Sequence, residues 1–137
     1  MGKHYLHSDI TFSKQFEAGT LNPSLFTHEA HLRLAWIYIK NFGIDVACKL
    51  LCTQIIRFDT IHGDGTKFHK TLTVAAVKAV WHFIQRSKST TFHDFIQEFP
   101  RLKYNFNDLI STHYSPDVLQ HEQAKIVYMP PNLLPFT

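Results

Sequence analysis

The chain has 137 residues, of which 45% are hydrophobic and 18% are charged, and its formal net charge is +3. This length suffices for one compact core and is short for two domains of ordinary size, so we expect a single domain over residues 1–137. The 14 Lys and Arg residues are spread along the chain and form no basic stripe, which argues against a nucleic-acid partner.

The N-terminal stretch "MGKHYLHSDITF" has no apolar run typical of a signal peptide. No segment approaches the roughly 20 consecutive apolar residues that a membrane-spanning helix needs. We therefore expect a cytoplasmic protein without a membrane association. Cys48 and Cys52 lie four residues apart in a helical pattern, where a disulfide is geometrically awkward, and are interpreted as packing residues.

The spacing of apolar residues is helical in nearly every segment. It predicts long helices at about 8–18, 28–42, 44–61 and 67–86, with Thr27 and Thr66 as the N-caps of the second and the fourth. Shorter helices fit "FHDFIQEF", "YNFNDLIST" and "SPDVLQHEQAKIV", and the tail "YMPPNLLPFT" is expected to be extended. The predicted fold is an all-α, single-domain helical bundle of about five to seven helices with an extended Pro-rich C-terminal tail.

Three histidines stand out because they are predicted to face inward near the starts of their helices. Projection of the second helix places His31 on its inward side and His28 at the edge of that side, with Glu29 and Arg33 on the opposite side. His69 lies on the centre line of the apolar face of the fourth helix. The positive end of a helix dipole favours neutral imidazole, which is the form that binds a metal or accepts a proton.

The three imidazoles would meet if three consecutive helices pack up, down and up, since the second and fourth helices then run parallel. We therefore predict a site for a divalent transition metal, zinc or iron, with His28, His31 and His69 as ligands. Should the site be catalytic, Tyr114 or Thr73 is a candidate to orient a bound water or substrate.

A structural interpretation of the same residues stands beside the metal site. An inward histidine most often bonds a carbonyl or another side chain, and Thr73 can bond the carbonyl four residues earlier. Tyr114 can be a packed aromatic residue with a satisfied hydroxyl. The alternative function is then a metal-free small-molecule-binding or protein-interaction module. Six further histidines fall in predicted loops or on polar faces and receive no role: His4, His7, His62, His82, His93 and His121.

The segments "FTHEAHLRLAW", "FHKTLT" and "HYSPDVL", followed by "PPNLLP", resemble an uncharacterised family of short bacterial helical proteins. Its motifs are F-x-H-x-x-H-L-R-x-A-W, Y-H-x-T-x-T and Y-S-P-x-x-L, in this order. The resemblance covers most of the chain after residue 16 and implies no established activity. The chain has Phe68 and Lys70 where Tyr and Glu are expected. The resemblance implies as motif positions His28, His31, Arg33, His69, Thr71, Thr73 and Tyr114.

Overall fold

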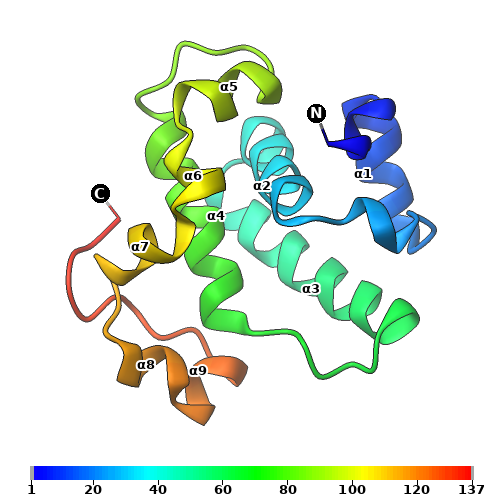
Figure 1. Cartoon of the computed structure of the whole chain (residues 1–137). Coiled ribbons are helices and arrows are strands. Elements are labelled where there is room, and N and C mark those ends of the chain that lie inside the picture. Colours follow the sequence, from blue (N-terminus) through cyan, green and yellow to red (C-terminus); the bar gives the residue numbers. More distant parts are fainter. Residues whose placement is uncertain (1, 137) are drawn as a thin grey trace. The chain divides into compact units, whose positions relative to one another are not determined.

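The computed structural model describes residues 2–136 (Figure 1). Over these residues the fold is all-α, as predicted, and contains no strand. Two short 3-10 helices, η1 (Lys3–Leu6) and η2 (Pro23–Leu25), precede and follow the first α-helix. The α-helices of the described residues are α1 (Asp9–Ala18), α2 (His28–Phe42), α3 (Ile44–His62), α4 (Lys70–Ile84), α5 (Phe92–Glu98), α6 (Arg101–Tyr104), α7 (Phe106–Ser111), α8 (Pro116–Gln120) and α9 (Glu122–Ile126).

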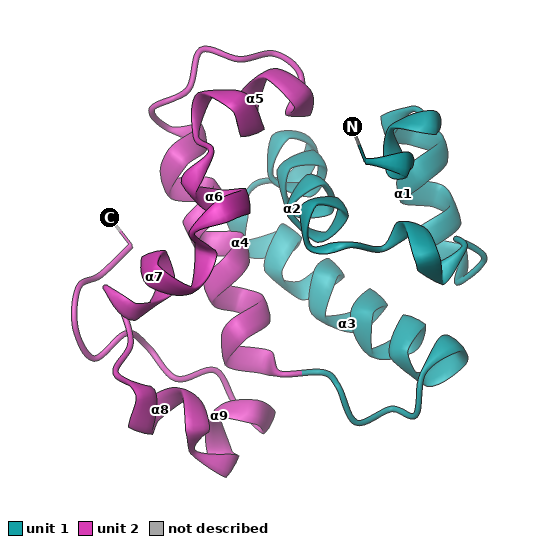
Figure 2. Cartoon of the chain, viewed as in Figure 1, with its two compact units in different colours: residues 1–68 teal, residues 69–137 magenta. Residues whose placement is uncertain are grey.

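The chain divides into two compact units, unit 1 (Met1–Phe68) and unit 2 (His69–Thr137), which Figure 2 shows in different colours. In unit 1, α2 packs along α3, and α1 contacts both. In unit 2, α4 packs against α9, which also contacts α8. The single domain over residues 1–137 and the parallel packing of the second and fourth long helices stay predictions.

The predicted limits of the first two long helices agree closely with α1 and α2. Ser8 caps α1 by accepting a hydrogen bond from the Thr11 N–H, and α1 ends where Gly19 adopts a left-handed φ of 78°. Thr27 caps α2 as predicted, accepting from the Ala30 N–H. Five helices within residues 2–136 have seven or more residues.

The start of the fourth long helix was predicted wrongly. It begins at Lys70 and not near Lys67, and its N-cap is His69 in place of Thr66. Residues 63–69 form a loop before the helix, in which the Lys67 N–H donates to Asp59 Oδ2 at 2.9 Å. The Nδ1 atom of His69 then accepts from the Leu72 N–H at 3.1 Å, as the side chain of an N-cap residue does.

An aromatic cluster forms much of the core of unit 1. The ring of Phe16 in α1 lies 4.6 Å from that of Phe26 and 4.8 Å from that of Phe58 in α3. Ala47 and Leu51 of α3 are fully buried. Gln54 of α3 is buried and accepts a hydrogen bond from the Tyr38 hydroxyl.

Arg33 ties the N-terminal segment to α2. Its guanidinium donates to the carbonyl oxygens of His4 and His7 at 2.7 and 2.8 Å, and it pairs with Asp9 at 2.8 Å. The same group lies over the ring of Phe12, 4.7 Å from its centroid. Arg33 is buried, so its predicted position on the outward side of α2 was wrong. A charged residue can face inward when such partners replace its water.

In unit 2 the segment 127–136 follows the last helix and is neither helix nor strand, and we call it the C-terminal strap. Thr71 Oγ1 donates to the Val127 carbonyl at 3.0 Å and accepts from the Met129 N–H at 3.1 Å. The Tyr114 hydroxyl donates to the Met129 carbonyl at 2.7 Å. Side chains of α4 and of the segment before α8 therefore hold the strap through its backbone.

None of the helices within residues 2–136 combines the length and the apolar character that crossing a membrane requires.

We expect Arg33→Lys to lower the free energy of unfolding by about 2 kcal/mol or more, since a single ammonium cannot replace the forked donors of a buried guanidinium. Urea denaturation of the two proteins measures this difference. The control is Arg57→Lys, because Arg57 is exposed and its bond to the Ala18 carbonyl is 3.5 Å long. This change should cost less than about 0.5 kcal/mol. Equal losses in both variants would contradict the anchoring role of Arg33.

Candidate functional site

The histidines of the predicted metal site belong to both units. His28 and His31 form part of the first turn of α2 in unit 1, and His69 is the first residue of unit 2. Among residues 2–136 the structure contains no group of three or more His, Cys, Asp or Glu side chains placed to hold a metal ion. The site formed by His28, His31 and His69 stays a prediction.

His28 is exposed, so its predicted inward direction was wrong. The next residue, Glu29, is buried in its place and accepts a hydrogen bond from the Tyr5 hydroxyl at 3.0 Å. Burial and this carboxylate raise the pKa of Tyr5 well above its usual range. The apolar pattern of α2 did not reveal this orientation, because two charged residues, Glu29 and Arg33, face the N-terminal segment.

His31 is half-buried, and its ring lies edge-on to that of Phe26 with 5.8 Å between the centroids. Burial and, to a smaller extent, the charge of the neighbouring His28 lower the pKa of His31 to about 4. The imidazole is therefore neutral near pH 7, which agrees with the reasoning from its first-turn position.

Both ring nitrogens of His69 contact backbone atoms. Nδ1 accepts from the Leu72 N–H, which leaves Nε2 to carry the hydrogen, and Nε2 lies 3.0 Å from the Leu119 carbonyl. The hydroxyl of Thr73 donates to the His69 carbonyl at 2.8 Å, which is the backbone bond that the structural interpretation predicts. These contacts favour a structural role for His69 and Thr73.

Tyr114 is buried, and its hydroxyl donates to the backbone of the C-terminal strap. Burial and the nearby Tyr128 hydroxyl raise the pKa of Tyr114 well above its usual range. The phenol therefore stays protonated at neutral pH and donates a hydrogen bond. This geometry matches the packed, satisfied tyrosine of the structural interpretation.

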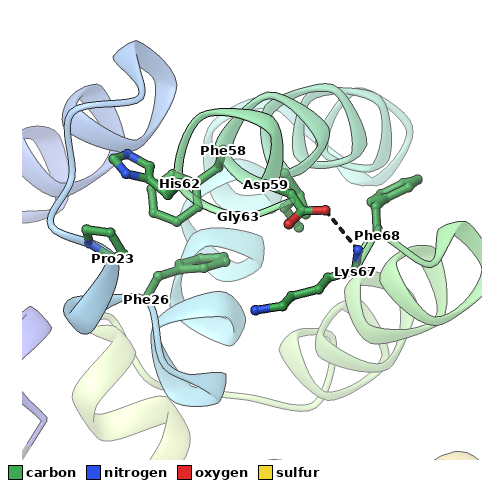
Figure 3. Close-up of a pocket in the computed structure, with 9 residues that line it drawn as sticks. Pro23, Phe26, Phe58, Asp59, His62, Gly63, Lys67 and Phe68 are labelled. Atoms are coloured by element: carbon green, nitrogen blue, oxygen red, sulfur yellow. Dashed lines mark hydrogen bonds between the residues drawn. The ribbon is translucent and has the colours of Figure 1, made fainter. Parts of the chain in front are cut away.

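An open pocket of about 280 Å³ lies within unit 1, and we call it the phenylalanine pocket. Its apolar lining includes Phe26, at the end of η2, and Phe58, on α3, whose ring centroids are 5.2 Å apart. Phe68, Pro23 and Ile55 complete this apolar lining. Two parts of unit 1, residues 23–26 and 55–68, thus supply the lining, which Figure 3 shows in close-up.

The loop at residues 63–67 forms one side of the phenylalanine pocket and is held by Asp59. Asp59 Oδ2 accepts from the Lys67 N–H, drawn as a dashed line in Figure 3. A Cβ atom on Gly63 would lie 2.5 Å from Asp59 Oδ1, so this carboxylate packs directly against the Gly63 backbone. Gly65 has a left-handed φ of 79°, a conformation that residues with a side chain rarely adopt. The loop geometry therefore depends on Asp59 and two glycines.

Two further polar residues line the phenylalanine pocket. The Nε2 atom of His62 lies 2.7 Å from the Gly19 carbonyl, so it carries a hydrogen and Nδ1 is the acceptor of the neutral ring. Lys67 is exposed, and no carboxylate among residues 2–136 lies within ion-pair distance of its ammonium group. Figure 3 shows the side chain of Lys67 extending toward Phe26 across the pocket.

Sequence reasoning assigned no role to the residues of this pocket. A signal was present, because Phe26 and Phe68 stand close in sequence to His28 and His69, and "HGDGTK" joins two long helices. The pocket also contacts one predicted site residue indirectly, since the Phe26 ring meets His31. The convergence of η2, the end of α3 and the following loop depends on tertiary packing, which helical periodicity does not describe.

In comparisons with known proteins, no family model, no curated protein and no solved structure matches the chain.

The titration of His31 should make the folded state less stable in acid. Its pKa is 6.5 in a free side chain and about 4 in the folded protein, so the unfolded chain binds the proton first as the pH falls. The stabilisation is complete above about pH 6.5, declines between about pH 6.5 and 4, and amounts to roughly 1–3 kcal/mol.

Urea denaturation at several pH values checks this prediction. His31→Gln should remove most of this decline, because glutamine does not titrate, whereas His28→Gln at the exposed neighbouring position should keep most of it. An unchanged pH profile in His31→Gln would refute the assignment to His31.

Proposed function

We propose that the protein is a metal-free small-molecule-binding module whose ligand occupies the phenylalanine pocket. The observation that carries this proposal is an open pocket of about 280 Å³ with three phenylalanines in its lining. Small-molecule sites are concave and mostly apolar, they contain a few polar groups, and their volumes start at about 300 Å³. The ligand is accordingly small, with a flat apolar body suited to aromatic walls.

The lining also supplies polar groups that can orient a ligand. His62 Nδ1 accepts a hydrogen bond when the ring is neutral, and Lys67 Nζ donates. The loop that carries Lys67 is held by Asp59 before any ligand arrives. A site that is ordered in advance loses little conformational entropy on binding, which favours affinity.

We expect Ile55→Phe to weaken binding of naphthol, a neutral probe, by about tenfold or more, because the added ring atoms occupy the space of the pocket. Ligand-observed NMR titration measures the dissociation constants. The control is Ile56→Phe, since Ile56 is the next residue of α3, is 47% exposed and does not line the pocket. A naphthol affinity that is equal in the two variants, or absent in the unmodified protein, would refute the proposed site. Thermal melting confirms that both variants are folded.

The metal site of His28, His31 and His69 is a second proposal. It is favoured by the neutral state of His31 and by the placement of two histidines three residues apart in the first turn of α2. In this proposal His69 exchanges its backbone contacts for a metal ion, and zinc or iron would be bound with an open coordination position.

Elemental analysis of protein purified without a metal-affinity tag tests the second proposal. We expect close to one equivalent of zinc or iron in the unmodified chain and much less in His69→Asn. Asparagine retains the ability to cap α4, so the free energy of unfolding of the metal-free variant should change by no more than about 1 kcal/mol. Protein without bound metal, or the same metal content in both chains, would rule this site out.

A further inference from the structure

The charged groups that line the phenylalanine pocket differ in how they are engaged. Asp59 Oδ2 accepts the Lys67 backbone N–H, and its other oxygen packs against Gly63. The carboxylate thus faces its own loop, and part of its charge is balanced by a hydrogen bond. A cationic ligand would have to compete with the loop for Asp59.

The ammonium group of Lys67, unlike the carboxylate of Asp59, is not held by the loop. The backbone of Lys67 is fixed by Asp59, but its ammonium group has no carboxylate of residues 2–136 at ion-pair distance. The nearby carboxylate of Asp64 accepts from the N–H and hydroxyl of Thr66 at 3.0 and 2.6 Å. The side chain extends across the pocket toward Phe26 (Figure 3), so a ligand between the aromatic walls would lie beside a cation.

We propose that the natural ligand of the phenylalanine pocket is a small aromatic anion, with its ring among Phe26, Phe58 and Phe68 and its carboxylate or phosphate paired with Lys67. This inference rests on the proposed function and adds the charge of the ligand to it. A charge-assisted hydrogen bond is stronger than a neutral one, so Lys67 supplies selectivity while the aromatic walls supply the apolar contact. The opposite preference, for an aromatic amine, would follow if Asp59 dominated the field in the pocket.

Three probes of one shape separate these cases: a naphthalene carboxylate, the matching naphthalene methylamine, and naphthol as the neutral reference. In the unmodified protein the carboxylate should bind more tightly than naphthol, and the amine more weakly. Lys67→Gln should weaken carboxylate binding by roughly three- to tenfold and leave naphthol unchanged. Lys67→Glu should reverse the order of the two charged probes. Lys49→Glu on the exposed surface of α3 makes the same change of net charge and should keep the order.

The proposed function and this inference fail in different ways. If naphthol does not bind, or binds equally to the Ile55→Phe and Ile56→Phe variants, the pocket itself is not the site. If naphthol binds as proposed but the amine binds as tightly as the carboxylate, the anion inference is overturned and the pocket remains. A carboxylate affinity that is unchanged in Lys67→Gln overturns the inference in the same way.

Discussion

The hydrogen bond from the Lys67 N–H to the Asp59 carboxylate is the constraint on which the candidate site depends. It ties the loop after α3 back to the last turn of that helix. The N-cap His69 starts α4 at Lys70, so Phe68 lies outside the helix and forms part of the pocket lining. A side chain that would otherwise continue a helical face instead lines a cavity. One carboxylate thereby holds the loop that forms one side of the pocket.

The packing of unit 1 links this pocket to His31, one of the predicted metal ligands. Phe26 touches Phe16 and Phe58 in the core, and its ring also meets His31. A change of volume or charge at His31 is therefore transmitted directly to one wall of the pocket, because close-packed interiors do not absorb such changes locally. His31 can matter for binding without contacting a ligand.

The sequence predicted local structure better than it predicted the site. Caps such as Ser8 and Thr27 depend on bonds within one turn, so the limits of α1 and α2 could be inferred. The hydrogen bond that holds the pocket loop and the burial of Arg33 join residues 8 and 29 positions apart, which periodicity does not contain. A histidine suggests a metal or catalytic site by its side chain alone, whereas a phenylalanine on a helical face suggests only core packing. The pocket lining could not be predicted, because none of its residues indicates a binding site until the fold brings them together.

The contacts of the C-terminal strap have a consequence for how the chain tolerates sequence drift. Thr71 and Tyr114 bind backbone atoms of Val127 and Met129, and these bonds involve neither of those two side chains. The side chains that fix the backbone of the strap at these points, and that evolution must keep, are therefore those of Thr71 and Tyr114. Positions 127 and 129 can exchange one residue for another while the strap keeps its course, apart from proline. Proline would remove the N–H that donates to the Gln123 carbonyl at 127 and the N–H that donates to Thr71 Oγ1 at 129.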